Sequence, residues 1–259
     1  MKKTAAHVHK EGRVVTLTID RPPLNILDIA TIEEMHDKIE RATRDRAAEV
    51  LVIRAAGEKA FSAGVEVREH TPEKVPAMLG AFHGLIRLLL HADPVTIAVV
   101  HAPALGGGAE LALACDLVAA AAGTHFSFPE IQLGCYPPVA LATLPLRIGP
   151  QRAAELVLLG RDVPAEEALG MGLVNRIAPR GDLDAVVGEI VRSLSEKSPE
   201  VLRLTVRLLR RSTAEEATRR IQEAEEAYIS ELLASDDMKE GIQAFLEKRK
   251  PVWRRPEGP

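Results

Sequence analysis

Two short, almost wholly apolar runs constrain the fold of this chain more than any other feature. Residues 50–53 read Val-Leu-Val-Ile, and residues 95–100 read Val-Thr-Ile-Ala-Val-Val. A strand with one exposed face alternates apolar and polar residues, whereas these runs do not alternate. They therefore indicate strands that are buried on both faces.

Strand and helix patterns alternate around these two runs. Further strands are expected at residues 14–19 and 117–121, and amphipathic helices at residues 31–43 and 78–90. A helix of small residues is expected after the glycine run at residues 106–108. This alternation predicts an α/β layered fold.

From Pro150 onward, helical patterns dominate the chain. We therefore divide it into an α/β core at residues 1–195 and a helical C-terminal region at residues 196–259. The apolar stripes of that region predict packing on the core or on another subunit. Helices are expected at residues 151–159, 164–171, 183–193, 199–211 and 213–233, and a last one from residues 235–240 to Pro251.

Composition excludes several classes of protein. The 259 residues are 46% hydrophobic and 27% charged, which is enough to form a large core and argues against disorder. The net charge of -4 argues against a general polyanion binder, so we expect no nucleic-acid partner. No apolar run reaches membrane-spanning length, and no signal core follows residues 1–4, so a cytoplasmic protein without a membrane partner is expected.

The cysteines and histidines indicate neither a disulfide nor a metal site. Cys115 and Cys135 are the two cysteines, and both stand in apolar surroundings without a CxxC pattern. They are therefore expected to be reduced core thiols. The eight histidines show no spacing typical of metal ligands, so we expect no bound metal.

Two glutamates stand in settings that suit acid–base chemistry. Glu110 follows Gly106-Gly107-Gly108 and is surrounded by alanine and leucine, and Glu130 follows Pro129 in an apolar segment. Apolar surroundings raise the pKa of a carboxyl group, so each could exchange a proton near neutral pH. Each glutamate also has a structural interpretation, because a carboxylate in the first turn of a helix is stabilised by the helix dipole.

The triple glycine itself has two interpretations. A tight turn with close helix packing is the commoner reason for such a cluster. The functional alternative is that the Gly107 N–H lies at a helix N-terminus and points at an anion or a carbonyl oxygen. The run is neither a P-loop nor a dinucleotide-binding fingerprint, because the Gly-Lys-Ser/Thr ending and the GxGxxG spacing are both missing.

Taken together, the ordered motifs of this chain resemble the crotonase (enoyl-CoA hydratase/isomerase) superfamily over essentially the whole length. The resemblance implies a ββα-superhelix core with a helical C-terminal trimerisation region, assembled as a homo-oligomer, either a trimer or a dimer of trimers. It also implies an acyl-CoA substrate and no separate cofactor, because coenzyme A is part of the substrate. The matching segments are residues 21–27, 60–66, 104–110, 115–116, 128–134, 168–175 and 244–249.

The resemblance also assigns roles to individual residues. The backbone N–H groups of Val65 and Gly107 would form an oxyanion hole for the thioester oxygen. Of Glu110 and Glu130, one would activate water and the other would deliver a proton to carbon. Coenzyme A would contact Ala63, Val65, Glu66, Val67, Arg68, Phe245 and Lys248, and the acyl pocket would include Cys135, Tyr136 and Pro138.

Finer features narrow the expected reaction. Family members that only isomerise double bonds often keep just one of the two glutamates, so the presence of both favours hydration and a hydro-lyase. Residues 64–67, 70–75, 82–83 and 136–139 resemble the cyclic dienoyl-CoA hydratases of benzoyl-CoA breakdown, so cyclohexa-1,5-diene-1-carbonyl-CoA is the expected substrate. The alternatives are a straight-chain enoyl-CoA hydratase or isomerase, and a non-catalytic relative that binds RNA or protein.

Overall fold

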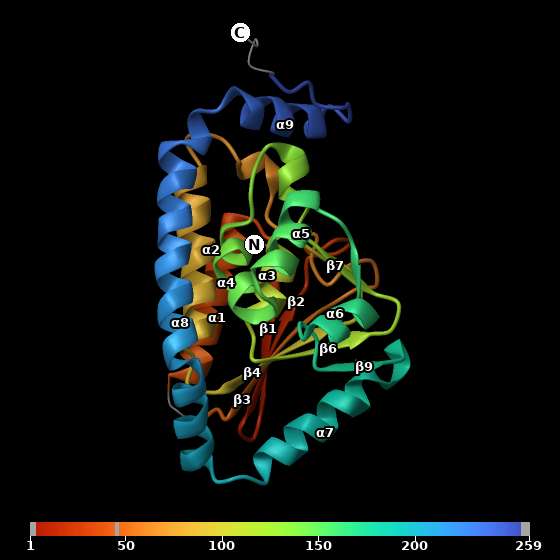
Figure 1. Cartoon of the computed structure of the whole chain (residues 1–259). Helices are drawn as coiled ribbons and strands as arrows, with labels where there is room; N and C mark the ends of the chain where they lie inside the picture. Colours follow the sequence, from red (N-terminus) through yellow and green to blue (C-terminus); the bar gives the residue numbers. More distant parts are fainter. Residues whose placement is uncertain (1–3, 45–46, 255–259) are drawn as a thin grey trace.

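A six-stranded sheet forms the centre of the computed structural model, which describes residues 4–44 and 47–254 (Figure 1). Its strand order is β1-β2-β3-β4-β6-β9; β1 runs antiparallel to β2, and every other pair is parallel. The strands are β1 Ala6–Glu11, β2 Val14–Ile19, β3 Val50–Ala55, β4 Val95–Val100, β6 Leu117–Ala121 and β9 Arg176–Ala178.

A small three-stranded sheet lies beside the large one. Its order is β5-β7-β8, with β5 parallel and β8 antiparallel to β7. Neither this sheet nor the edge strands β1 and β9 were expected from the sequence. Two-residue and three-residue strands are too short to show periodicity, so tertiary pairing decides them. The strands are β5 Ala104–Leu105, β7 His125–Ser127 and β8 Val163–Pro164.

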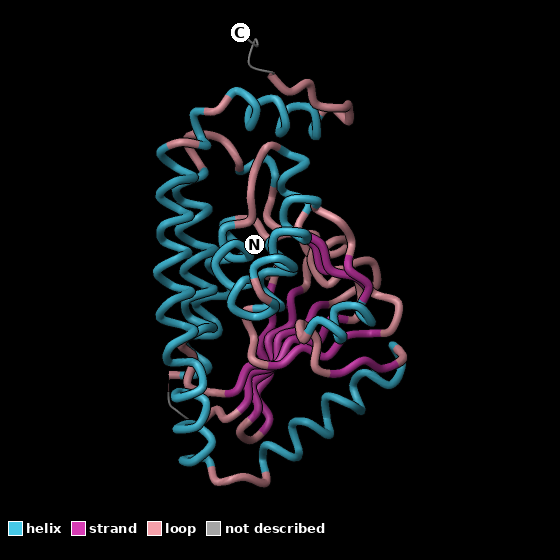
Figure 2. Tube along the Cα trace, viewed as in Figure 1, coloured by secondary structure: helices cyan, strands magenta, loops and turns pink. Residues whose placement is uncertain are grey.

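Helices cover both faces of the large sheet, as the helix and strand colours of Figure 2 show. The helices are α1 Ile29–Thr43, α2 Val75–Leu90, α3 Gly107–Leu113, α4 Pro138–Ile148, α5 Pro150–Leu159, α6 Ala165–Met171, α7 Leu183–Ser195, α8 Pro199–Ser230 and α9 Asp236–Leu246. Short 3-10 turns are η1 Val67–Glu69, η2 Pro129–Leu133, η3 Arg180–Asp182 and η4 Leu232–Ala234.

The packing on both faces of β3 explains why its sequence does not alternate apolar and polar residues. Leu51 and Ile53 pack into the larger apolar core, which contains buried side chains of α1 to α4. Val50 and Val52 point the other way and pack into a second core against α7. Burial on both faces, predicted from the apolar runs, is therefore confirmed, and so is the α/β layered fold.

The helical C-terminal part differs from the sequence prediction in two places. The two helices expected at residues 199–211 and 213–233 are one continuous helix, α8, of 32 residues. No glycine or proline interrupts it after its first residue, and α8 packs along both α2 and α4. The last helix, α9, ends at Leu246 rather than at Pro251. Just beyond its end, Lys248 adopts a positive φ of 55°.

The helix α4 was not expected from the sequence, because its prolines are typical of turns and not of helix interiors. Pro138 occupies the start of the helix, where its missing N–H costs nothing, and Pro145 lies inside it. The Thr143 hydroxyl donates a hydrogen bond to the Val139 carbonyl at 2.8 Å. The Pro138 position expected in the acyl pocket therefore begins a helix that packs against α8.

Polar contacts of Arg210 and Glu225 help to join α8 to the rest of the fold. Arg210 donates to Asp116 and to the Ala92 and Pro94 carbonyls, while Glu225 of α8 pairs with His83 of α2. The predicted division at residue 195 falls between α7 and α8 and stays a prediction. Within the described ranges, no helix is both long and apolar enough to cross a membrane.

Candidate active site

Glu110 lies in the first turn of α3, where a glycine turn brings the chain out of β5. Gly106 has a φ of 50°, and a Cβ on Gly108 would lie 2.4 Å from the Ser62 carbonyl oxygen, so α3 can pack this closely only because that residue is glycine. Glu110 is 4% exposed, and its Oε1 accepts a hydrogen bond from the Ala140 N–H at 2.8 Å. The helix α4 therefore fixes this carboxylate in position.

Glu130 reaches the same region from η2. A Cβ on Gly106 would lie 2.4 Å from Glu130 Oε1, so the carboxylate passes directly over the bare backbone of that glycine. Glu130 as a whole is partly exposed, whereas its Oε2 is buried and has no hydrogen-bond partner among the described residues. One oxygen is thus packed against the glycine turn and the other is free to bind.

Burial changes the acid–base properties of both carboxyl groups. Loss of solvent raises the pKa of Glu110, and backbone hydrogen bonds from Ala140 and Val139 oppose that rise. Burial also raises the pKa of Glu130, and the negative charge of Glu110 raises it further. Each carboxyl group can therefore exchange a proton near neutral pH, and the charge on one raises the pKa of the other.

Two backbone amides lie close together beside these carboxylates. Leu27 donates its N–H to the Gly64 carbonyl and accepts the N–H of Glu66, so the intervening Val65 amide is not used by Leu27. A Cβ on Gly107 would lie 3.4 Å from the Val65 nitrogen, and one on Gly64 would lie 3.3 Å from the Gly107 nitrogen. A Cβ on Gly64 would also lie 2.9 Å from the Leu105 carbonyl oxygen, so this approach requires glycine there, and the distances place the Val65 and Gly107 amides side by side.

A cavity of about 90 Å³ connects these groups. The residues expected from the sequence that line it are Ala63, Val65, Val67, Gly107, Glu110, Glu130, Tyr136 and Pro138. The fold thus brings together three separate parts of the chain, residues 63–67, 107–110 and 130–138. Their arrangement can bind a carbonyl oxygen at two amides and exchange protons at two carboxyl groups.

Five of the expected site residues lie outside the cavity walls. The Glu66 carboxylate caps η1 by accepting the Arg68 N–H at 3.1 Å, and the Arg68 side chain is 76% exposed. Cys135 is buried in the cluster that contains Tyr228 and Met238, where burial raises the pKa of its thiol to about 11. Phe245 and Lys248 are exposed at the end of α9. Both cysteines are free and buried, as predicted.

Several wall residues were not among the expected site residues. Phe82 and His83 come from α2, and Tyr228 comes from α8. Residues 82–83 belong to the segments that resemble the cyclic dienoyl-CoA hydratases, but no site role was expected for them, because an aromatic or histidine residue on an apolar helix face is typical of a core position. Only the packing of α2 against α8 turns these side chains toward the glutamates.

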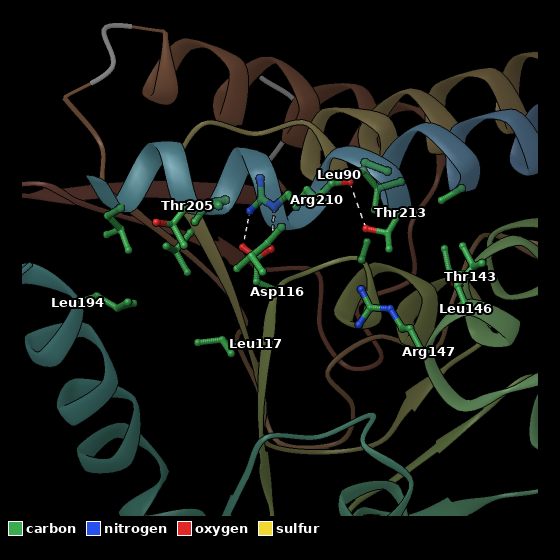
Figure 3. Close-up of a pocket in the computed structure, with 17 residues that line it drawn as sticks. Leu90, Asp116, Leu117, Thr143, Leu146, Arg147, Leu194, Thr205, Arg210 and Thr213 are labelled. Atoms are coloured by element: carbon green, nitrogen blue, oxygen red, sulfur yellow. Dashed lines mark hydrogen bonds and ion pairs between the residues drawn. The ribbon is translucent and has the colours of Figure 1, made fainter. Parts of the chain in front are cut away.

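A larger cavity, of about 460 Å³, lies elsewhere, between α7, α8 and the start of β6 (Figure 3). Its walls are mostly leucine, valine and alanine, and its charged residues are Asp116, Arg147 and Arg210. Asp116 is paired with Arg210, and Arg147 donates to the Cys115 carbonyl at 3.3 Å. This cavity has no free acid–base pair, so the smaller one is the better candidate despite its size.

No metal cluster is formed by the described residues. In residues 4–44 and 47–254, no three side chains of His, Cys, Asp or Glu gather in a way that could hold a metal ion. The candidate site therefore consists of backbone amides, two carboxyl groups and the surrounding apolar and aromatic wall.

Comparison with known proteins agrees with this geometry. Cyclohexa-1,5-dienecarbonyl-CoA hydratase from Thauera aromatica is 34% identical over 248 residues, which cover 95% of both chains. Carnitinyl-CoA dehydratase from Escherichia coli K12 is also 34% identical, over 96% of this chain and 97% of that protein. The crystal structure of an enoyl-CoA hydratase from Mycobacterium avium subsp. paratuberculosis K-10 superposes with a TM-score of 0.87 at 30% identity, covering 97% of this chain and 99% of that one.

The family assignment covers nearly the whole chain. Residues 9–256 match the enoyl-CoA hydratase/isomerase family, and the relatives just described are hydratases and dehydratases. Such enzymes are hydro-lyases. The resemblance seen in the sequence motifs is thus confirmed: the chain belongs to the enoyl-CoA hydratase/isomerase, or crotonase, family and shares its fold.

Proposed function

We propose that this hydro-lyase adds water across a double bond conjugated to a coenzyme A thioester, with Glu110 and Glu130 as the catalytic residues. The observation that carries the proposal is the convergence of two buried carboxyl groups and two adjacent backbone amides on one cavity. A protein that only binds acyl-CoA has no need of two carboxyl groups that can exchange protons near neutral pH.

The two amides would stabilise the charge that develops on the substrate. The thioester oxygen accepts hydrogen bonds from the Val65 and Gly107 N–H groups, and these bonds strengthen as the oxygen becomes an enolate. Gly107 also begins α3, so the positive end of that short helix points at the same oxygen. Both amides are fixed by backbone geometry before substrate arrives, which avoids reorganisation during the reaction.

The carboxyl groups would then divide the proton transfers between them. Glu110, whose ionised form is stabilised by backbone N–H groups, takes a proton from water as the water oxygen bonds to the β-carbon. The electrons of the double bond move onto the thioester oxygen. Glu130, whose pKa is raised by burial and by the charge of Glu110, delivers its proton to carbon and completes the addition.

The proposed substrate is cyclohexa-1,5-diene-1-carbonyl-CoA. The rigid Tyr136-Pro137-Pro138 segment lines a small cavity and suits a compact ring better than a long flexible chain. The similarity to the Thauera hydratase supports this substrate, while the equal similarity to carnitinyl-CoA dehydratase makes a carnitinyl thioester the second candidate. A straight-chain enoyl-CoA is the third.

Coenzyme A and a second copy of the chain are the proposed partners. Ala63, Val65 and Val67 lie along the cavity mouth, and exposed Arg68, Phe245 and Lys248 are proposed to reach the nucleotide. Exposed apolar side chains on α8 support assembly into a trimer or a dimer of trimers, which light scattering after size-exclusion chromatography would measure. These side chains are Val201, Leu204, Leu208 and Leu209.

The test is a comparison of three thioesters with one purified protein. Cyclohexa-1,5-diene-1-carbonyl-CoA, crotonobetainyl-CoA and crotonyl-CoA are each supplied in water enriched in ¹⁸O, and the acyl product is weighed by mass spectrometry. The proposal expects hydration with the highest kcat/KM for the cyclic diene. Preference for another thioester would overturn the substrate, and the absence of water addition to any of the three would overturn the reaction.

A further inference from the structure

His83 is a buried side chain of the cavity wall to which the proposed reaction gives no role. Its side chain is fully buried, and its Nδ1 lies 2.6 Å from Glu225 Oε2 of α8. Arg87 Nη1 lies 3.9 Å from the same carboxylate oxygen. One imidazole nitrogen is thus held by a charged group that comes from a different helix.

This contact decides which hydrogen-bonding group His83 presents to the cavity. The hydrogen bond from His83 lowers the pKa of Glu225, so the carboxylate is ionised and accepts the Nδ1 proton. Nε2 is then the ring nitrogen left for a ligand, and it is an acceptor when the imidazole is neutral. This Nε2 atom is buried and has no hydrogen-bond partner among the described residues.

His83 and the two glutamates line the same cavity but come from different elements. The glutamates are carried by α3 and η2, whereas His83 and its partner are carried by α2 and α8. Around His83 the wall is apolar or aromatic. Its neighbours in this wall are Met78, Leu79, Phe82 and Tyr228.

Two further buried polar atoms of this cavity lack strong partners. Glu130 Oε2 has none among the described residues, and the Tyr228 hydroxyl faces only the weakly hydrogen-bonding thiol of Cys135. A plain hydrocarbon acyl group would leave the His83 acceptor buried and unpaired, which is unfavourable. A hydroxyl group on the acyl portion would satisfy it.

We propose that His83, positioned by Glu225, is a specificity residue that accepts a hydrogen bond from a hydroxyl group on the acyl part of a coenzyme A thioester. The inference rests on the proposed acyl-CoA site and names its ligand class: hydroxylated acyl groups are bound in preference to hydrocarbon ones. The hydroxyl is either the one that hydration places on the β-carbon or a substituent farther along the acyl group.

The test measures binding without requiring turnover. Isothermal titration calorimetry compares cyclohexanecarbonyl-CoA with its 2-, 3- and 4-hydroxy derivatives, which are saturated and therefore cannot be hydrated. The wild-type protein is expected to bind at least one hydroxylated thioester roughly tenfold more tightly than the unsubstituted one. Preference for the 2-hydroxy ring identifies the hydration product, and preference for the 3- or 4-hydroxy ring identifies a substituent.

Variants assign the preference to His83. His83→Phe keeps the ring shape without the acceptor and is expected to abolish the preference, while His83→Gln, which offers an amide oxygen, should retain part of it. His91→Phe is the matched control, because His91 Nε2 also joins α2 to α8, at 3.1 Å from Thr218 Oγ1, but lies outside the cavity. This control should keep the full preference.

Each outcome separates this proposal from the proposed function. Equal binding of all four thioesters by the wild-type protein would overturn the role of His83 while leaving the hydratase proposal intact, and this holds even where His83→Phe does not fold. An unchanged preference in folded His83→Phe would do the same. Preference for a hydroxylated ring without any hydratase activity would contradict the reaction alone, and no binding of any thioester would contradict both.

Discussion

At the scale of single residues, the two glutamates owe their different chemical settings to single neighbours. Glu110 receives an N–H from Ala140, whereas Glu130 Oε2 receives nothing from the described residues. Glu130 lies over Gly106, and the helix of Glu110 packs on Ser62 through Gly108, so a Cβ at either glycine would clash. The sequence marked both carboxylates, but their difference depends on α4, which the sequence did not reveal.

Replacing either glutamate by its neutral amide is expected to remove most of the activity. Glu110→Gln and Glu130→Gln keep the side-chain shape but cannot transfer a proton, so kcat should fall by about 10²–10⁴-fold for each. Steady-state kinetics with the preferred thioester measures this. Glu33→Gln, on the exposed face of α1, should be unchanged. A fully active variant at position 110 or 130 would reject the role proposed for that glutamate.

The glycine at position 106 offers a sharper test, because it separates backbone strain from displacement of the catalytic group. Gly106→Ala places a Cβ 2.4 Å from Glu130 Oε1, so Glu130 must move and kcat should fall at least tenfold. Gly12→Ala is the matched control: Gly12 has a similar φ of 56°, but a Cβ there meets nothing within 4 Å.

The positive φ should cost Gly12→Ala about 1–2 kcal/mol of stability. Gly106→Ala should lose at least as much, because its Cβ also meets Glu130 and its ψ of -126° lies outside the left-handed helical region. Thermal unfolding should therefore show a loss for both variants, while only Gly106→Ala loses activity. If Gly12→Ala lost activity to the same extent, strain rather than contact with Glu130 would explain the effect.

At the scale of secondary-structure elements, α8 is the helix that closes the cavity from outside. It contributes Tyr228 to the wall and Glu225 to His83, although its own sequence looks like a solvated helix. The sequence divided it in two near residue 212, because a serine and a threonine there have weak helix propensity. Packing against α2 and α4 outweighs that preference, and propensity alone could not indicate it.

The Arg210 anchor is expected to hold α8 in place. Its guanidinium donates to Asp116 and to two backbone carbonyls, and its side chain is 12% exposed. Arg210→Met leaves Asp116 without its partner and should reduce the free energy of unfolding by about 3–5 kcal/mol. Urea titration followed by circular dichroism measures this loss.

An exposed arginine of the same helix provides the control for that measurement. Arg219 also forms ion pairs, with Glu216 and Glu223, but its side chain is 56% exposed. Solvent screens such pairs, so Arg219→Met should change the midpoint far less. Equal effects of the two substitutions would show that the buried contacts of Arg210 are not what fixes α8.

At the scale of the whole molecule, the buried glutamates make stability depend on pH. The carboxyl groups of Glu110 and Glu130 have a raised pKa in the folded state compared with the ordinary value of 4.5. The folded protein therefore binds more protons than the unfolded chain above pH 4.5, so stability falls as pH rises from there through the raised values.

Glu130→Gln should remove part of that decline. Each unit by which the folded pKa exceeds the unfolded one corresponds to about 1.4 kcal/mol at high pH. The variant is thus expected to melt at a higher temperature than the wild type at pH 8.5, with the difference shrinking toward pH 5. Differential scanning calorimetry across this range measures it. A wild-type protein that is equally stable at both pH values would contradict the raised pKa.

The sequence by itself determined the layered fold, the family and the two carboxylates, because these depend on local patterns: apolar runs, a glycine cluster and short motifs around Glu110 and Glu130. Tertiary structure alone decided which residues face them. The helix α4, which its prolines made hard to predict, supplies the hydrogen bond to Glu110. The packing of α2 on α8 places His83 and Tyr228 in the cavity wall. Contacts between distant segments leave no local pattern, because each helix buries an apolar face whatever lies opposite.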